Sequence, residues 1–425
     1  MRRIYSLMIL ILLFTLAWPT LILGQPAGGA TTFPDHITLT WTGDPARTMT
    51  ITWRTDTSVS NGLVQYEKSA NPVSQRAEAE SSDFTTDLEK VHLFTTTLTG
   101  LSPDTKYTYR VGDGTHWSSS HSFSTADPKA QSFKFLVFGD SQSNATGKHP
   151  YELWRKTIHN AYESNSDTKF IVNMGDLVDT GQSGAHWNAW FAAAAGVIDA
   201  IPEMPVVGNH ETYGSRTTHR PEYWNAQFHL PQNGPTGLKN QAYSYDYGPV
   251  HFAELDSQQD EEKQYGDILS LQRSWLDADL SASQATWKIV LFHKTPYAIS
   301  ILRSNPAIKA AFCPIIERHH ADLVFNGHDH GIARTYPMNG KKWTQKPSQG
   351  TIYFTTGRSG EKTYATLMKM PYDTFFYNPL DQPNYLVVEV TQTKLTIRSM
   401  NQDGTLIDTF FIDKSNDIDS DIGQD

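Results

Sequence analysis

Five short apolar runs between residues 133 and 330 constrain the fold of this chain more than any other feature of its sequence. Each run has the length of a buried strand, and each ends in glycine or polar residues. The clearest is FKFLVFGDS (133–141), which is almost continuously apolar, as expected of a strand covered on both faces. The others are TKFIVNMGD (168–176), EMPVVGNHE (203–211), TWKIVLFHKTPY (286–297) and ADLVFNGHDH (321–330).

Segments with helical character separate these runs. Apolar residues recur at helical spacing in YELWRKTIHNAYES (151–164), and we also expect helices over 186–200 and 270–281. Alternating strands and helices predict an α/β arrangement with parallel strands. A β-hairpin is expected in QAYSYDYGPVHFAELDS (241–257), and further strands in 350–360 and 384–400.

The segment 36–125 has a different pattern, with short alternating strands such as HITLTW (36–41) separated by turn residues. This pattern predicts an all-β sandwich. The polar stretch STADPKAQS (124–132) then predicts a linker. At the other end, the acidic residues 413–425 include few apolar side chains and are predicted to be disordered.

The first 24 residues have the composition of a secretory signal peptide. Arg2 and Arg3 precede the apolar run LMILILLF (7–14), and small residues around Gly24 are suited to cleavage. The alternative is an uncleaved anchor, but the unbroken apolar run is short for a membrane span. We therefore expect a secreted protein, extracellular or periplasmic, with no membrane span in the mature chain.

Charge and cysteine content limit the possible functions. The chain has 35 Lys and Arg against 45 Asp and Glu; cleavage would remove two arginines, leaving 33 against 45, a net charge of −12. This acidity argues against nucleic-acid binding but not against a phosphate substrate, because bound metal ions would change the local field. The single cysteine, Cys313, has no partner for an intrachain disulfide and is predicted to be a buried apolar residue.

Polar residues with metal-binding side chains follow all five apolar runs. Parallel strands place their carboxyl ends at one edge of a sheet, so residues distant in sequence are expected to converge there. Oxygen and nitrogen donors without thiolates suit Zn²⁺, Fe or Mn²⁺. Six ligands are too many for one catalytic metal with an open position, but they fit two metals that share a carboxylate. The predicted ligands are Asp140, Asp176, Asn209, His293, His328 and His330.

Each of these motifs alone would be a weak signal, since a polar loop, a turn or a helix cap explains it equally well. Their order, each after an apolar run, is harder to explain by chance. The series GDSQ, GDLVD, GNHE, FH and GHDH resembles the calcineurin-like metallophosphoesterases. The preceding sandwich, with LTGLSPDTKYTYRVG, resembles a fibronectin type III module and the N-terminal domain of purple acid phosphatases.

This resemblance implies an α+β protein, with a β-sandwich over 35–126 and a four-layer α/β/β/α catalytic domain over 131–412. It also implies two divalent or trivalent metal ions (Fe, Zn or Mn) and phosphate-ester hydrolysis by a bridging hydroxide. By motif, Asp140 and His330 would bind the first metal and Asp176 would bridge. The second metal would be bound by Asn209, His293 and His328.

The resemblance further implies that His210 steadies the phosphoryl oxygens and protonates the leaving group, and that Glu211 orients a histidine. Two positions depart from the family. Asp179 stands where purple acid phosphatases have an iron-binding Tyr, and Gln142 where other members have a His. Gln142 could bind the first metal through its carbonyl oxygen or only hold a water. Asp179 could support a metal ligand or bind metal directly.

Substrate contacts are expected from two arginines, Arg303 after the second-metal His293 and Arg358 in TTGRSG. Tyr223, Trp224 and Phe228 could form an aromatic pocket wall or pack in the core. Four other histidines near these motifs are predicted to be ordinary polar residues: His186, His219, His229 and His251.

The function predicted from the sequence is therefore a secreted binuclear phosphoesterase acting on phosphomonoesters. One alternative is a phosphodiesterase or nucleotidase of the same superfamily. Another is a non-catalytic surface-binding protein, and the sandwich could also contact a cell surface or a polysaccharide.

Overall fold

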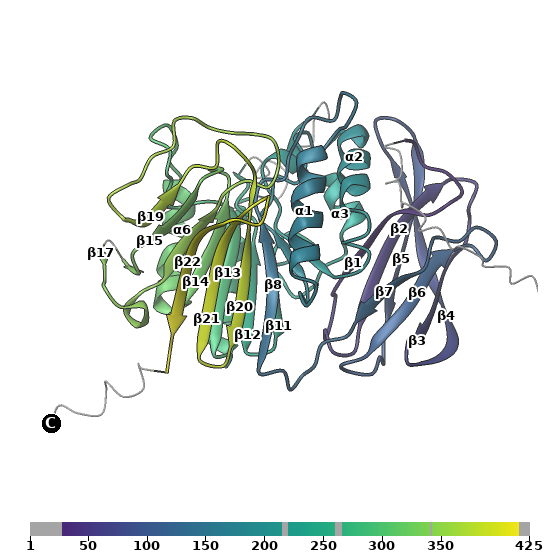
Figure 1. Ribbon diagram of the computed structural model, residues 1–425, viewed down its shortest axis with the longest axis horizontal. Helices are drawn as coiled ribbons and strands as arrows, with labels where there is room; N and C mark the ends of the chain where they lie inside the picture. The colour runs from purple at the N-terminus through teal and green to yellow at the C-terminus, as the bar shows by residue number, and fades with distance from the viewer. Residues whose placement is uncertain (1–27, 215–219, 260–265, 341, 416–425) are drawn as a thin grey trace, which may run out of the picture.

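The structure is a computed structural model that describes residues 28–214, 220–259, 266–340 and 342–415. The predicted signal peptide, His219 and the tail beyond residue 415 lie outside the described residues. Figure 1 shows the N-terminal strands packed beside a larger body that combines sheets and helices. Among the described helices, none has the length and apolarity needed to span a bilayer.

The N-terminal part is the predicted sandwich. The order of its strands is β1-β2-β5-β4-β3-β6-β7, and β4 connects the two halves because its first part pairs with β3 and its second with β5. Strand β2 is buried along almost its whole length, including Trp53, whereas β6 buries alternate residues such as Tyr109. The strands are β1 (Asp35–Thr40), β2 (Met49–Asp56), β3 (Gly62–Lys68), β4 (Asn71–Thr85), β5 (Lys90–Leu98), β6 (Lys106–Gly112) and β7 (His121–Ser124).

Two mixed sheets form the centre of the second part. The first contains β10 (Glu203–Pro205), β9 (Ile171–Asn173), β8 (Ser132–Phe138), β20 (Asn384–Thr391), β21 (Lys394–Asn401) and β22 (Leu406–Asp413), in that order. The second contains β11 (Tyr243–Tyr247), β12 (Val250–Leu255), β13 (Trp287–Lys294), β14 (Leu323–Gly327), β18 (Ile352–Thr356), β15 (Ile332–Thr335) and β19 (Asp373–Tyr377). A small hairpin consists of β16 (Met338–Asn339) and β17 (Lys342–Trp343).

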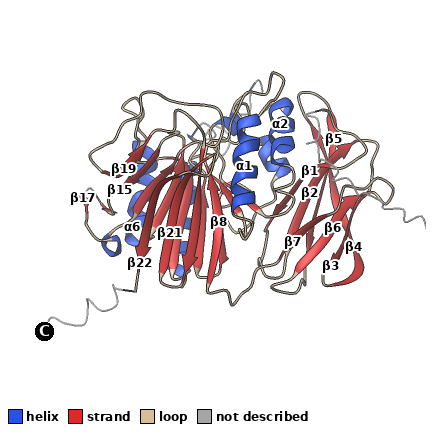
Figure 2. Cartoon of the chain, in the orientation of Figure 1, coloured by secondary structure: helices blue, strands red, loops and turns tan. Residues whose placement is uncertain are grey.

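Helices lie against both sheets, beside β8 on the first sheet and behind the second, in agreement with the predicted four layers (Figure 2). Aromatic contacts define each layer boundary: Phe138 with Trp154 of α1, Phe135 with Phe252 between the sheets, and Phe292 with Phe312 of α6. The helices are α1 (Glu152–Ser164), α2 (Gly184–Ala194), α3 (Glu222–Gln227), α5 (Ile268–Ala282) and α6 (Pro306–Arg318), with 3-10 turns at His210–Thr212 and Pro347–Gln349.

Strand direction places the predicted ligands together. Strands β8, β9 and β10 run parallel in the first sheet, and β12, β13, β14 and β18 run parallel in the second. Their carboxyl ends reach the same edge of the two stacked sheets, so the loops that follow them meet there. The site is therefore built by both sheets and lies at their common edge.

Several local expectations need correction. Helix α2 ends at Ala194 rather than at residue 200. Strand β4 (Asn71–Thr85) was not predicted, because almost every residue in it is exposed and no apolar alternation marks it. Of the two alternatives for Tyr223, Trp224 and Phe228, core packing is the correct one, because all three are fully buried and Phe228 contacts Trp187 of α2. Cys313 is buried, as predicted, and burial raises the pKa of its thiol to about 12.

The sandwich and the second domain share one apolar core. His36 stacks on Phe191 of α2 with ring centroids 4.2 Å apart, and Arg54 Nη1 donates to Asn188 Oδ1 at 2.6 Å. Tyr109 donates its hydroxyl hydrogen to the carbonyl of Asp199 at 2.7 Å. These contacts join the two domains through buried side chains rather than through a solvated interface.

We expect that deleting residues 36–125 yields an insoluble or unfolded catalytic fragment, because the deletion exposes the apolar face of α2 to water. Soluble yield and circular dichroism of the fragment, compared with those of the full chain, measure this. A soluble, folded and active fragment would show instead that the catalytic domain is independent of the sandwich.

His251 is an ion-pair clamp far from the strand-end site. Its Nδ1 lies 2.7 Å from Asp246 Oδ1 and its Nε2 lies 2.8 Å from Asp279 Oδ2, which ties the β11–β12 hairpin to α5. Burial alone would lower the pKa of His251, but the two carboxylates raise it to about 9. The histidine therefore stabilises the fold as an imidazolium.

We expect the stabilisation by His251 to depend on pH. A folded-state pKa near 9, against an unfolded value of about 6.5, gives a contribution that is complete below pH 6.5 and lost as pH rises through 9. Its size should be on the order of 2 kcal/mol. Chemical unfolding of the wild type and of His251→Gln at pH 6 and 9.5 measures it: the difference in unfolding free energy should shrink at the higher pH. An equal difference at both values would argue against the clamp.

Candidate metal centre

The predicted ligands occupy strained backbone positions at the strand ends. Asp140, Asp176, His328 and His330 all have positive φ, between 47° and 73°. Residues other than glycine rarely adopt this region, and such strain persists where surrounding structure enforces it, most often at functional sites. In this chain the strain turns the four side chains away from the strand direction and into one common space.

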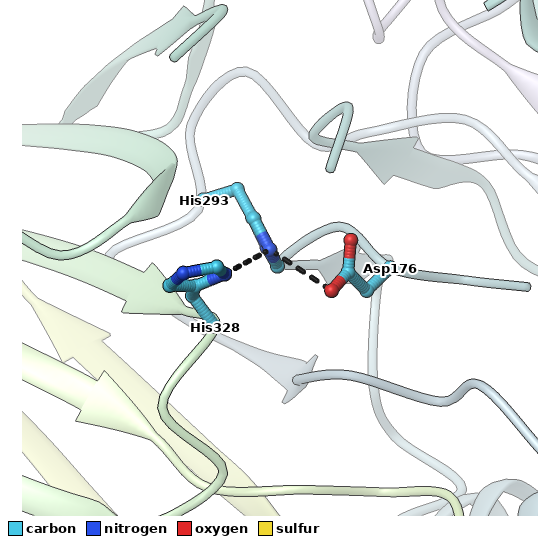
Figure 3. Close-up of side chains that lie close together, drawn as sticks. All are labelled: Asp176, His293 and His328. Atoms are coloured by element: carbon cyan, nitrogen blue, oxygen red, sulfur yellow. Dashed lines mark hydrogen bonds and ion pairs between the residues drawn. The ribbon is translucent and has the colours of Figure 1, made fainter. Parts of the chain in front are cut away.

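One group of donors surrounds His293 (Figure 3). Its Nε2 lies 3.1 Å from Asp176 Oδ2, 3.2 Å from Asn209 Oδ1 and 3.2 Å from His328 Nδ1. On the other side of the ring, Nδ1 donates to the carbonyl of Met174 at 2.7 Å. This bond fixes the tautomer, so the Nε2 lone pair faces Asp176, Asn209 and His328.

The second group contains Asp140 and His330, again with Asp176. His330 Nε2 lies 3.1 Å from Asp140 Oδ1, while its Nδ1 donates to the carbonyl of Lys362 at 2.8 Å. The backbone N–H of His328 donates to both oxygens of Asp140, at 3.0 and 2.9 Å. This bond holds the carboxylate at the start of the GHDH loop.

The two donor groups fit metal ions. Two ligand atoms bound to one ion at about 2.0–2.2 Å are separated by roughly 3.0–3.6 Å, which is the spacing found around His293. Asp176 belongs to both groups, as a bridging carboxylate would. Buried Gln142 donates from Nε2 to Asp176 Oδ2 at 3.4 Å, and its Oε1 has no hydrogen-bond partner among the residues that the structure describes. That oxygen could serve as a further metal ligand next to the Asp140–Asp176–His330 group.

Electrostatics within the centre also favour bound cations. Although burial raises the pKa of Asp176, His293 and His210 hold it well below its usual value. Burial together with the neighbouring His293 and Arg303 lowers the pKa of His328. Although burial lowers the pKa of His293, Asp176 raises it to about 9, so this ring balances the carboxylate when no metal is bound. A bound metal ion would supply the same positive charge in its place.

His210 lies at the rim of the centre, next to Asn209. Its Nδ1 donates to the carbonyl of Asp179 at 2.7 Å, and its Nε2 lies 3.8 Å from Asp176 Oδ2. The backbone N–H of His210 donates to Asp176 Oδ1 at 2.9 Å. The side chain therefore faces the donor groups without belonging to either of them, consistent with a contact to substrate rather than to metal.

Glu211 does not orient a histidine, contrary to the expectation. Its two carboxylate oxygens accept backbone N–H bonds from Asp176, Leu177, Val178 and Gly208, at 2.7–3.3 Å. Burial and the Asp176 carboxylate raise the pKa of Glu211, while these donors oppose the rise. The side chain is fully buried and ties the loop after β9 to the loop after β10.

Close backbone packing at this junction requires glycine. A Cβ on Gly208 would lie 2.2 Å from the backbone nitrogen of Asp176, and one on Gly175 would lie 2.8 Å from His293 Nδ1. Gly175 also has a φ of +87°. Any larger residue would therefore displace a predicted ligand.

The two arginines lie differently from the expectation. Arg358 is 2% exposed and donates to the carbonyls of Gly360, Pro379 and Leu380, so its guanidinium supports a loop and has no access to substrate. Arg303 donates to the carbonyl of His328 and to Asp329 Oδ1 at 2.9 Å. It braces the GHDH loop from outside, and its side chain remains 25% exposed.

The remaining candidates lie outside the two donor groups. The Asp179 side chain is 45% exposed, with Oδ1 3.5 Å from His210 Nδ1. His186 Nδ1 pairs with the hydroxyl of Tyr151 at 2.9 Å, and His229 contacts threonine hydroxyls of the sandwich. His251 belongs to the clamp described above. These three histidines have polar or charged partners outside the two donor groups, in line with the prediction that they are not ligands.

Sequence reasoning missed Lys362, whose Nζ lies 3.1 Å from His210 Nε2. The loop that contains it follows strand β18, and a polar segment after a buried strand was the only signal that could have indicated it. Two adjoining groups of Asp, Asn and His donors at the strand ends define a candidate two-metal centre, of the kind that phosphatases and other metal-dependent hydrolases use.

Comparison with known proteins identifies the family. Residues 34–125 match the purple acid phosphatase N-terminal domain, and residues 133–331 match the calcineurin-like phosphoesterases. The chain is therefore a purple acid phosphatase-like metallophosphoesterase, which confirms the resemblance inferred from its motifs.

Individual proteins agree with this assignment. Purple acid phosphatase 18 of Arabidopsis thaliana is 27% identical over 340 residues, covering 77% of this chain and 72% of its own length. An Arabidopsis relative named "Probable inactive purple acid phosphatase 1" is 23% identical over 63% of this chain and 49% of its own. The solved structure of the purple acid phosphatase PPD1 from yellow lupin has the same fold, with a TM-score of 0.76, 19% identity, and 91% of this chain and 76% of that chain covered.

Proposed function

We propose that this protein is a binuclear phosphatase that hydrolyses phosphomonoesters. One observation supports the proposal above all others: two groups of metal-binding side chains lie side by side and share the carboxylate of Asp176. The family supplies the reaction type, because a calcineurin-like phosphoesterase acts on phosphate esters.

Each residue in the centre has a defined task in this proposal. Asp140, His330 and, through its oxygen, Gln142 would hold the first metal, whereas Asn209, His293 and His328 would hold the second. Tyr213 accepts a hydrogen bond from Asn209 Nδ2 at 2.9 Å, which turns the amide oxygen of Asn209 toward His293. When bound, two such ions neutralise charge on a phosphoryl group and lower the pKa of water.

His210 would act on the substrate itself. Because Nδ1 donates to the Asp179 carbonyl, Nε2 is the atom that faces the donor groups. In the structure this nitrogen accepts a hydrogen bond from Lys362. With substrate bound and Nε2 protonated, the ring could instead hydrogen-bond a phosphoryl oxygen and pass its proton to the leaving group. The backbone N–H of His210 also donates to Asp176 Oδ1. His210 would therefore both contact the substrate and position the proposed bridging carboxylate.

Elemental analysis and a substrate pair test the proposal. We expect about two metal ions per chain, and faster hydrolysis of p-nitrophenyl phosphate than of bis(p-nitrophenyl) phosphate. The identity of the metals, among Fe, Zn and Mn, follows from the same analysis. A preference for the diester would favour the phosphodiesterase alternative, and a protein without bound metal or hydrolysis would be a non-catalytic binding protein.

We also propose that the protein is secreted, on the basis of Arg2, Arg3 and the apolar run 7–14. Mass spectrometry of the mature protein, expressed with its native N-terminus, tests this by locating the first residue. Detection of residue 1 in the exported protein would contradict cleavage after Gly24.

A further inference from the structure

Lys362 contacts the metal centre through both its backbone and its side chain. Its carbonyl accepts the hydrogen bond from His330 Nδ1 at 2.8 Å, and its Nζ lies 3.1 Å from His210 Nε2. One residue thus touches a proposed ligand of the first metal and the proposed substrate-contacting histidine. No role for it follows from the motifs.

The ammonium group of Lys362 has hydrogen atoms left for a ligand. His210 Nδ1 carries a hydrogen that it donates to Asp179, so its Nε2 accepts one hydrogen bond from Lys362. Among the described residues, the other charged neighbour of Lys362 is Asp179 Oδ1 at 3.8 Å, too far for a hydrogen bond. A lysine has three N–H donors, and this side chain is 35% exposed, so a bound anion can reach it.

We propose that Lys362 binds the phosphoryl group of the substrate directly, beside His210. This inference rests on the proposed phosphatase function. An ammonium next to the metal centre is suited to a non-bridging phosphoryl oxygen, because hydrogen bonds between charged partners are the strongest in proteins. Lys362 is a catalytic residue in this assignment, since it touches the substrate.

The rival role for Lys362 is to neutralise Asp179. Their separation of 3.8 Å and the exposure of both side chains, 35% and 45%, make that ion pair a weak one. The two roles predict different behaviour when Asp179 is removed as well. If Lys362 only compensates the carboxylate, Asp179→Asn should restore what Lys362→Met loses; if Lys362 contacts phosphate, the double variant should remain defective.

Calorimetric titration of the metal-loaded full chain with inorganic phosphate tests the inference. We expect Lys362→Met to weaken phosphate binding by roughly ten- to hundredfold, and Lys362→Arg to recover part of the loss. KM for p-nitrophenyl phosphate should rise more than kcat falls, because the contact exists before the reaction begins. Lys369→Met is the matched control: Lys369 is exposed on the same segment, donates to Thr374, and should bind phosphate as the wild type does.

Metal content and thermal unfolding must accompany each titration. Both should be unchanged in Lys362→Met, because His330 is held by the backbone carbonyl and not by the lysine side chain. The inference is overturned if Lys362→Met binds phosphate within twofold of a catalytically active wild type, or if Asp179→Asn restores binding in the double variant. A metal-loaded wild type that neither binds phosphate nor hydrolyses any ester overturns the proposed function and this inference together.

Discussion

Replacing Asp176 with Ala should abolish phosphatase activity while leaving the protein folded. The Asp176 carboxylate belongs to both donor groups, with Oδ2 3.1 Å from His293 Nε2 and Oδ1 bonded to the His210 N–H. Without it, no side chain in the described centre joins the two groups. Loss of a two-metal clamp removes several kcal/mol of transition-state stabilisation, so kcat/KM should fall by roughly 10³-fold or more.

Metal analysis separates this result from simple misfolding. The bound metal should fall from about two ions per chain to one or fewer, while circular dichroism stays unchanged because the site lies at the edge of the sheets. Asp403→Asn serves as the control, since Asp403 is exposed and bonds only to Thr405 and Gln382 among its described partners. An active Asp176→Ala enzyme with two metals would rule out the bridging assignment.

Replacing Glu211 with Gln should reduce stability and metal affinity together. The carboxylate accepts N–H bonds from Gly208, Asp176, Leu177 and Val178, and an amide would turn an NH₂ group toward two of these donors. Buried donors left without an acceptor cost about 3 kcal/mol in unfolding free energy. Because the junction positions Asp176, metal affinity should also fall by about ten- to hundredfold.

Chemical unfolding and metal titration of Glu211→Gln measure the two effects. Glu152→Gln is the control: Glu152 is paired with Arg155 on the surface of α1, and its replacement should change the unfolding free energy by no more than about 0.5 kcal/mol. If Glu211→Gln unfolds like the wild type and binds metal as tightly, the junction between the two loops does not depend on this carboxylate.

The convergence of the proposed metal ligands could be predicted because their signals are local. Each follows an apolar run that is long enough to be a buried strand, and parallel strands in one sheet have their ends at one edge. Asp140 and His328 could thus be placed together although 188 positions separate them. The layer order was predicted less directly, from the resemblance of five motifs to one family.

The supporting contacts could not be predicted from sequence. Glu211 lies next to the GNH motif, but its partners are backbone amides, which every residue possesses and no sequence pattern marks. Arg358 follows a strand as the ligands do, yet its guanidinium turns inward to carbonyls of the segment 360–380. Strand position indicates where a residue lies but not which way its side chain points.

Sequence alone determined which side chains stand at strand ends, because hydrophobic periodicity and turn residues are properties of short segments. It also determined the chemistry available there, since a set of Asp, Asn and His without Cys favours certain metals. Tertiary structure alone decided that Lys362 meets His210, that Glu211 joins two loops, and that the sandwich shares the core of the catalytic domain. Those contacts depend on how two sheets stack and how loops cross their edge, and only the packing of the whole chain fixes both.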